Sequence, residues 1–485
     1  MRLFNAARSP LKIFCLSLMV VTAAPLAANE FNLPSLGDTS SSVMSREQEF
    51  QLGRAWLSML RGSVRTLEDP LLKDFVETHV FSLAETSQLE DRRLTFVTID
   101  SPQLNAFAAP GGIIGVNGGL FLHAHTEAEF ASVMAHELAH LSQRHFARGL
   151  QHQQQNRIPL MTAMLASVIL AASGGGDAGF AALASTQAAA IQEQRRFSRQ
   201  NEQEADRIGL LNLTGAGYDP NAMPDMFERL ARLSRFSRTP PEFLLTHPVS
   251  QSRISDSRNR ASQLRSDGRR DSLYYQMMRA RVQLFYEESP GLAARRFRAL
   301  LDEHGGEHAA ARYGLALALT RSGQQEAAKE HMQVLLAEHP DNIAVQLAQV
   351  ELDGSLNRLD EALSRLDRLL QIRPDNYPAL EARANMLLRK QDYRGAEQVT
   401  DRLARLRSED PDIWYLVSEV RGLAGNILGV HQARAEYFML AGDLDQADEQ
   451  LDQALKRAGD NFVVSSRIKA RKDEVARRRE IIRSF

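Results

Sequence analysis

A 34-residue period in the second half of the chain constrains its fold more than any other feature. Four alanines follow one another at this spacing: Ala294, Ala328, Ala362 and Ala396. The segment His-Pro-Asp-Asn at 339–342 reappears 34 residues later as Arg-Pro-Asp-Asn at 373–376, and loosely as Asp-Pro-Asp at 410–412. Two independent markers therefore share one period. Small residues where helices touch, with proline between units, predict stacked helix-turn-helix units that form an α-solenoid.

This period resembles that of the tetratricopeptide repeat. We expect four to five repeats in a domain at 268–485, with atypical units at the ends. The register slips after Pro411, where Trp414 begins an irregular helix, and it resumes near Ala441. Stacked helix pairs present a concave surface that suits extended or partly folded protein clients.

The first 28 residues have the pattern of a secretory signal. Three basic residues precede an apolar run at 13–21, and small residues end the segment at Ala27-Ala28. The apolar run is too short to span a membrane comfortably, so we expect cleavage after Ala28. An uncleaved anchor is the alternative. A polar arm at 29–44 would then begin the mature protein.

Composition excludes several classes of function. The only cysteine, Cys15, lies inside the predicted signal, so a mature chain without it has no cysteine nucleophile and no cysteine-ligated zinc. With 58 basic and 60 acidic residues the net charge is −2, which gives no basic field for nucleic acid. The 44% of hydrophobic and 24% of charged residues are typical of folded soluble proteins.

Residues 45–267 predict a mostly helical domain with a small sheet. Apolar periodicity, capping signals and β-branched runs predict its elements in this order: helices at 45–60 and 70–83, a strand at 94–99, a hairpin at 105–116 with an exposed outer edge, a helix from the Thr126/Glu129 capping box to about Gln155, and a helix at 191–213. Pro240-Pro241 and His247-Pro248 predict loops. The 15-residue apolar stretch at 158–172 is interpreted as a buried helix, with a membrane-facing or substrate-facing flap as the alternative.

His136-Glu137-Leu138-Ala139-His140 is the motif that carries chemistry. Histidines four apart on a helix share one face, so both imidazoles can reach one zinc ion, and Glu137 can accept a proton from water beside it. Catalytic zinc needs a third protein ligand and an open fourth position. His145 falls off the shared face, so Glu202 on the next long helix is the better candidate. Asp206, four residues after Glu202, could fix the tautomer of a liganding imidazole.

These residues resemble a known family. His136-Glu137-x-x-His140 followed by Glu202-x-x-Ala205-Asp206 is similar to the zinc metallopeptidases that include the prenyl-protein endopeptidases and the membrane protease HtpX. The resemblance implies one Zn²⁺ per chain and hydrolysis of internal peptide bonds, with Glu202 rather than Glu204 as the third ligand. It also implies that Asp206 assists, either as proton donor or as a brace for a ligand, and we favour the brace.

Two further segments share this resemblance. Thr246-His247-Pro248, with Arg253-Ile254 downstream, is similar to a third signature of the family. His247 would either fill the fourth metal position and hold the enzyme latent or act as a loop histidine bonded to backbone, and His247 and Arg253 are both candidates for the oxyanion partner. The edge strand expected to bind an extended substrate consists of Asn105, Ala106, Phe107 and Ala108.

The order of signal, peptidase domain and repeats resembles the periplasmic members of this family that assist the assembly of outer-membrane β-barrel proteins. That implies a periplasmic location, with unfolded or stalled barrel proteins as clients that are chaperoned or degraded. It also implies contact with the barrel-assembly machinery through the repeats and peripheral contact with the outer membrane. The alternative is a client-binding scaffold whose metal site is latent or mainly structural. A membrane-integral prenyl protease is the weaker competitor, because 158–172 is the only internal apolar run.

Overall fold

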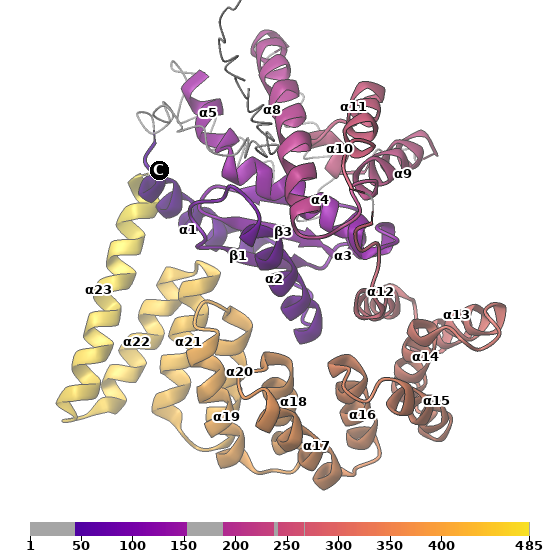
Figure 1. Ribbon diagram of the computed structural model, residues 1–485. Coiled ribbons are helices and arrows are strands. Elements are labelled where there is room, and N and C mark those ends of the chain that lie inside the picture. The colour runs from indigo at the N-terminus through magenta and orange to yellow at the C-terminus, as the bar shows by residue number, and fades with distance from the viewer. Residues whose placement is uncertain (1–43, 153–187, 237–240, 266, 485) are drawn as a thin grey trace, which may run out of the picture. The chain divides into compact units, whose positions relative to one another are not determined.

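The computed structural model describes residues 44–152, 188–236, 241–265 and 267–484. The predicted signal and the apolar stretch at 158–172 lie outside these ranges, as does nearly all of the predicted arm. The described part is mostly α-helical with one three-stranded sheet, which confirms the predicted fold class (Figure 1).

Two helices open the described chain where the sequence predicts them. Helix α1 (Arg46–Ser63) begins with a capping box in which Ser45 and Gln48 bond each other's backbone, and it buries Trp56. Helix α2 (Pro70–Glu85) has proline in its first turn and Asp69 as its N-cap, a combination that satisfies the free N–H groups of a helix start. Both helices bury one apolar face against the sheet and the core around it.

The sheet has the strand order β1-β3-β2, with β2 at one edge. Strand β1 (Thr95–Ile99) runs parallel to β3 (Ile113–Asn117), which forms a hairpin with β2 (Ala106–Ala109). The predicted edge position of β2 is correct, but its side chains are mostly buried rather than exposed. Phe107 lies opposite Gly115, where any β-carbon would overlap its ring.

The helix that carries the histidine motif is almost entirely buried. Helix α3 (Gly118–His123) leads into α4 (Glu127–Ser142), whose cap Thr126 accepts a bond from the Glu129 N–H. The side chain of Glu129 accepts from the His125 N–H instead of from Thr126, so half of the expected capping box is present. The prediction of one helix to Gln155 is wrong, because α4 ends at Ser142 and Arg144 has a left-handed φ of 49°. A separate helix, α5 (His145–His152), follows.

A close approach of two helices sets the position of the next functional segment. Helix α8 (Ala188–Gly215) contains Gly209, where a β-carbon would lie 3.1 Å from the Ala135 carbonyl oxygen and from the His136 Cα. A β-carbon there would require the backbone of α4 to shift by a few tenths of an ångström, so the glycine favours the close approach that brings the acidic residues of α8 beside the motif. Helices α9 (Ala222–Phe236), α10 (Phe243–Thr246) and α11 (Gln251–Ala261) complete this region.

Twelve helices follow in chain order in the part of the chain that the structure describes (Figure 1). Their bounds are α12 (Leu273–Tyr286), α13 (Pro290–Glu303), α14 (Ala309–Arg321), α15 (Gln325–Glu338), α16 (Ile343–Ser355), α17 (Leu359–Ile372), α18 (Tyr377–Arg389), α19 (Tyr393–Leu406), α20 (Pro411–Leu423), α21 (Ile427–Ala441), α22 (Leu444–Ala458) and α23 (Phe462–Ser484). Three of the marker alanines, Ala328, Ala362 and Ala396, are completely buried.

The expected slip of register after Pro411 is wrong. Helices α14, α16, α18 and α20 begin 34 residues apart, and so do α15, α17, α19 and α21. The proline stands at a different position in the last of these units, but the residue that caps the following helix keeps its position. Asn342, Asn376 and Asp410 occupy equivalent positions, and each side chain accepts a backbone N–H of the helix that follows.

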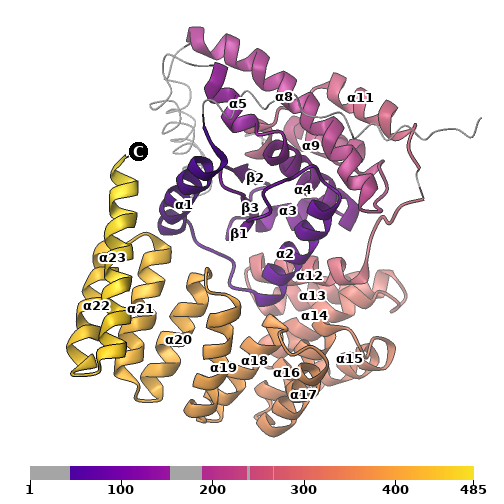
Figure 2. The ribbon, with the colours of Figure 1, turned by 60° about the vertical axis from the view of Figure 1, so that its left-hand side comes forward.

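Helix α2 lies next to repeat helices in the view of Figure 2, and polar contacts join them. Arg407 forms an ion pair with Glu77 of α2, and Lys73 of α2 pairs with Asp412. At the other end of the repeats, the Tyr275 hydroxyl of α12 donates to the Ala124 carbonyl oxygen at 2.8 Å.

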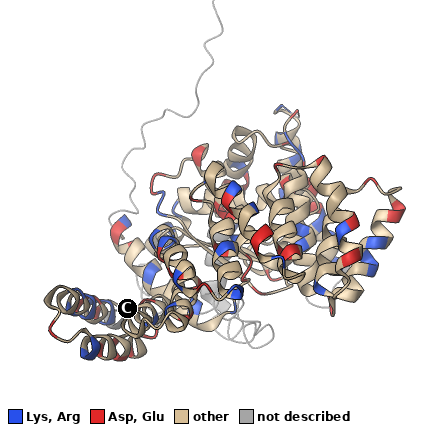
Figure 3. Cartoon of the chain, turned by 90° about the horizontal axis from the view of Figure 1, so that it is seen from below, with Lys and Arg blue, Asp and Glu red and all other residues tan. Residues whose placement is uncertain are grey.

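Acidic and basic residues are interspersed along the described helices (Figure 3). None of these helices combines the length and apolar character needed to cross a membrane.

Candidate metal centre

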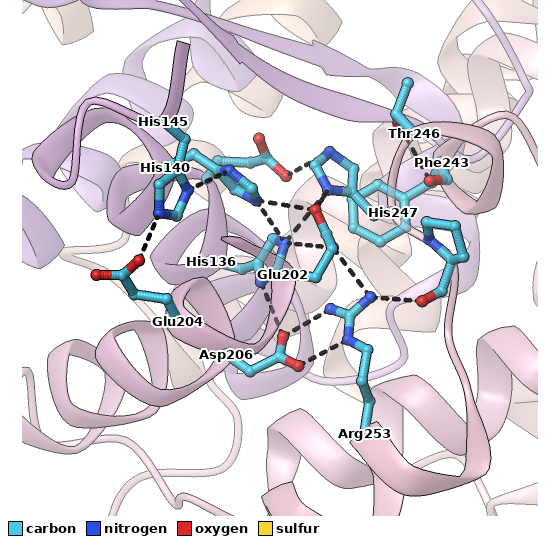
Figure 4. Close-up of polar contacts among 12 residues, drawn as sticks. His136, His140, His145, Glu202, Glu204, Asp206, Phe243, Thr246, His247 and Arg253 are labelled. Atoms are coloured by element: carbon cyan, nitrogen blue, oxygen red, sulfur yellow. Dashed lines mark hydrogen bonds and ion pairs between the residues drawn. The ribbon is translucent and has the colours of Figure 1, made fainter. Parts of the chain in front are cut away.

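Four elements bring the predicted site residues together (Figure 4). Helix α4 supplies His136, Glu137 and His140; α8 supplies Glu202 and Asp206; the residue after α10 is His247; and α11 supplies Arg253. Every one of these side chains is buried except that of His140, which is 15% exposed.

Four side chains turn one donor atom each toward a common point. His136 Nε2 is 3.1 Å from His140 Nε2 and 3.4 Å from His247 Nδ1. Glu202 Oε1 is 3.4 Å from His140 Nε2 and 3.0 Å from His247 Nδ1. Zinc bonds of about 2.0–2.1 Å in a tetrahedron place neighbouring ligand atoms about 3.3 Å apart. The donor atoms are therefore spaced as four ligands of one small metal ion.

The chemistry of the donors also fits a metal. Burial lowers the pKa of His140 to about 3, which keeps this imidazole in the neutral form that can ligate. Burial opposes ionisation of Glu202, but His247, His136 and His140 outweigh it and hold the pKa of Glu202 well below its ordinary value. Three imidazoles and one carboxylate, without a thiolate, form a donor set that suits zinc.

A second layer of charge surrounds the His136 side of the site. His136 Nδ1 lies 3.1 Å from Asp206 Oδ1, and the two carboxylates near it raise the pKa of His136 to about 10 against the effect of burial. Arg253 donates to both oxygens of Asp206 at 2.6 and 2.7 Å and lies 2.9 Å from Glu202 Oε2. It also donates to the Pro248 carbonyl oxygen. The Arg253 guanidinium is thus committed to holding acidic groups and the loop after His247.

Glu137 lies between the donor cluster and the edge strand. Its carboxyl group is buried, which raises its pKa, and the Ala108 backbone N–H of β2 donates to it. Its Oε1 has no hydrogen-bond partner among the described residues and is 3.5 Å from His247 Nε2. A carboxylate with a raised pKa and a free oxygen is suited to accept a proton.

The strand predicted to bind substrate is tied to the loop that carries His247. Asn105 Nδ2 donates to Glu242 Oε2 at 3.4 Å, and the Phe243 N–H donates to the Leu104 carbonyl oxygen. The predicted substrate strand therefore contacts Glu137 through Ala108 of β2, and the residues just before β2 attach it to the start of α10.

Sequence reasoning missed two residues of the site. The spacing predicts that His145 falls off the shared face of a continuous helix, yet its Nδ1 lies 2.9 Å from His140 Nδ1. Its other ring nitrogen is 3.2 Å from Glu204, which Arg148 also contacts. The break of the helix at Arg144 causes this placement, and no local sequence signal marks that break.

Comparisons with known proteins support a metallopeptidase domain followed by tetratricopeptide repeats. Residues 70–261 match peptidase family M48, and residues 284–352 and 355–420 match the tetratricopeptide repeat. The chain is 33% identical to the β-barrel assembly-enhancing protease of Escherichia coli K12, over 97% of this chain and 96% of that protein. It is 32% identical to the protein of the same name from Yersinia pestis, over 93% of each. It is also 35% identical to the mitochondrial metalloendopeptidase OMA1 of Arabidopsis thaliana, over 35% of this chain and 32% of that one.

Proposed function

The chain belongs to the family of β-barrel assembly-enhancing proteases and is a metalloendopeptidase with an M48 domain, and from this premise we propose that it is a periplasmic zinc enzyme of outer-membrane protein quality control. Its clients would be stalled or misfolded β-barrel proteins. The observation that carries the proposal is the convergence of four metal-donor atoms beside the buried carboxyl group of Glu137.

His136, His140 and Glu202 are proposed to hold Zn²⁺, one ion per chain. When bound, zinc supplies Lewis acidity, which polarises a carbonyl oxygen and makes water more acidic. Glu137 accepts the proton of the attacking water and returns it to the leaving amine. The Ala108 N–H next to Glu137 places the reacting group beside β2, so an extended client bound along Asn105–Ala108 would present its backbone to the base.

His247 is proposed to keep this site latent. Its Nδ1 lies among the donor atoms of His136 and Glu202, in the position that a catalytic site leaves open. A site with four protein ligands is characteristic of structural rather than catalytic zinc. Withdrawal of His247 would admit water and a client. The attachment of α10 to the strand at Leu104 and Asn105 supports a connection between client binding and this withdrawal.

The repeats are proposed to capture clients and to contact the barrel-assembly machinery. Stacked helix pairs form extended surfaces for partly folded chains, and the relatives' name refers to barrel assembly. Export by the predicted signal, with cleavage after Ala28, would place the protein in the periplasm, where peripheral contact with the outer membrane is expected. Chaperone-like holding and degradation would then be two outcomes for the same captured client.

Zinc content and cleavage of an unfolded β-barrel protein test the proposal together. The purified mature wild type, Glu137→Gln and His247→Ala should each be compared. We expect one zinc per chain in the wild type, weak cleavage by the wild type, stronger cleavage by His247→Ala and none by Glu137→Gln. Glu137→Gln should keep its zinc and its client binding, because Glu137 is not a ligand.

The second candidate function is a client-binding scaffold with a structural metal site. The observation that favours it is the closed set of four donors, which leaves no ligand position for water. Normal cellular function of a Glu137→Gln variant that does not cleave would mean that the peptidase step is dispensable and would favour the scaffold. Normal cleavage by Glu137→Gln would overturn the assignment of Glu137 as the base. A wild type that binds no zinc would overturn the catalytic assignment.

A further inference from the structure

The two metal-binding histidines are supported on their outer sides in different ways. His136 turns Nε2 to the donor cluster and Nδ1 to Asp206, so a carboxylate contacts it directly. His140 also turns Nε2 to the cluster, but its Nδ1 meets another imidazole, that of His145, at 2.9 Å. His145 Nε2 in turn lies 3.2 Å from Glu204 Oε2.

Only one arrangement of protons satisfies this chain when His140 ligates a metal. A neutral imidazole that binds through Nε2 carries its proton on Nδ1 and donates it. His145 Nδ1 must then accept, so His145 carries its own proton on Nε2 and donates it to Glu204. Glu204 accepts without ambiguity, because an ionised carboxylate has no proton to donate and its Oε2 lies 3.2 Å from His145 Nε2. The tautomers of both histidines are therefore fixed by one carboxylate.

We infer that His145 and Glu204 are positioning residues that orient His140 as a metal ligand, His145 by accepting its Nδ1 proton and Glu204 by fixing the tautomer of His145. This inference rests on the metal site of the proposed function. A carboxylate would thus support each of the two histidines: Asp206 contacts His136 directly, whereas Glu204 acts on His140 through His145. Carboxylate-terminated contacts of this kind orient ligands and strengthen metal binding.

The backbone conformation of Arg144 supports a functional role for the position of His145 beside His140. On an uninterrupted helix a residue five positions after His140 would lie about 140° around the axis from it. Arg144 instead adopts a left-handed φ of 49°, a conformation that disfavours any residue with a β-carbon. Its guanidinium donates to Glu49 at 3.1 and 3.2 Å and to the Met44 carbonyl oxygen at 2.7 Å. These contacts hold the unfavourable backbone in place, and the next residue is His145.

The competing explanation is that His145 and Glu204 only contribute to packing. The two side chains differ in burial, which allows this explanation to be tested. His145 is buried at 6% exposure, so its loss could disturb packing, whereas the Glu204 side chain is 35% exposed. A change at Glu204 that affected zinc binding would act through the hydrogen-bond chain rather than through the core. Arg148 donates to the same Glu204 oxygen at 2.9 Å, and among the described residues no hydrogen bond joins it to His145, which makes it a matched control.

Zinc affinity, measured by competition with a chromophoric chelator on the full mature chain, tests the inference. His145→Phe keeps the ring volume but removes the acceptor, and we expect a 10–100-fold weaker affinity. His145→Asn, whose carbonyl oxygen can accept the His140 proton, should restore most of it. Glu204→Met, which removes the acceptor, should weaken binding in the same direction, whereas Arg148→Met should stay within about twofold of the wild type. Substitution of Co²⁺ should give an altered visible spectrum for His145→Phe.

Melting of the metal-free proteins separates the two explanations. We expect His145→Phe and the wild type to unfold at the same temperature after chelation. Unchanged zinc affinity and an unchanged Co²⁺ spectrum in His145→Phe would overturn the inference, as would a loss of affinity that His145→Asn fails to restore. A loss matched by earlier unfolding of the metal-free protein would also overturn it in favour of packing. A wild type that binds no zinc would instead overturn the proposed function.

Discussion

Asp206 can act either as a brace for His136 or as a proton donor, and one substitution separates the two. Although burial opposes it, Arg253 lowers the pKa of Asp206, so the carboxylate holds no proton to donate. We therefore expect Asp206→Asn to weaken zinc binding about 10–100-fold while cleavage by zinc-saturated enzyme is largely retained. Chelator competition and cleavage at saturating zinc, both in the His247→Ala background, measure this. Intact affinity with lost cleavage would instead assign the proton-donor role.

At the scale of single residues, the sequence predicts the inner site but not its surroundings. His136, Glu137 and His140 are recognisable because a helix converts a spacing of four into one shared face. Glu202 can be predicted as a ligand because it lies on the next long helix and matches the family motif. The position of His145 depends on the left-handed backbone of Arg144, whose side chain donates to Glu49, almost a hundred residues earlier, and to the Met44 carbonyl oxygen. A contact so distant in the chain has no local pattern that could predict it.

At the scale of elements, the hairpin beside the site depends on a glycine that accommodates an aromatic ring. A β-carbon at Gly115 would lie 2.1 Å from the Phe107 ring, which packs edge-on against Trp56 with ring centres 5.7 Å apart. Gly115→Ala should therefore lower the free energy of unfolding by about 1–3 kcal/mol, as overpacking does, measured by urea denaturation. Gly291→Ala is the control, because its β-carbon would meet nothing and alanine favours the helix. Equal stability of both variants would contradict this account of the hairpin.

The sequence predicts helices and strands best where a single local pattern determines their position. Helices α1, α2 and α8 and the three strands lie where apolar periodicity, caps and β-branched residues place them. The break after Ser142 and the constant register beyond Pro411 were missed for opposite reasons. No proline or glycine marks the break after Ser142. In the repeats, the different position of the proline suggests a change of register, although Asp410 still caps the next helix at the expected position.

At the scale of the whole molecule, the sequence indicates two kinds of structure but not how they contact each other. The motif and the period come from separate parts of the chain, and each is read from local spacing. The contacts between α2 and the repeats are pairs of charged residues more than 300 positions apart, such as Glu77 with Arg407 and Lys73 with Asp412. Charged residues at such positions look like ordinary exposed surface in a sequence, so only the structure identifies them as an interface.

This interface contains a group that makes its stability depend on pH. Burial raises the pKa of Glu381 in α18 to about 7, an effect that Lys73 and Tyr377 reduce and that Asp410 and Asp69 increase. Between about pH 4.5, the ordinary value for a glutamate, and pH 7, the folded protein therefore binds more protons at Glu381 than the unfolded chain does. Its contribution to stability is lost as the pH rises through this window, because the ionised carboxylate must stay buried.

Replacement of Glu381 by glutamine should remove this dependence. Glutamine has a similar shape and no charge, so Glu381→Gln should raise the melting temperature at pH 8 by about 2–4 °C, the shift expected for roughly 1 kcal/mol, and by less at pH 5.5. Thermal unfolding of the metal-free protein at both pH values measures this without interference from the metal site. Glu338→Gln is a suitable control, because that exposed residue ends α15 and should give the same small shift at both pH values. A lower melting temperature of Glu381→Gln than of the wild type at both pH values would show instead that Glu381 is held ionised by Lys73 and stabilises the contact between α2 and α18 as an ion pair.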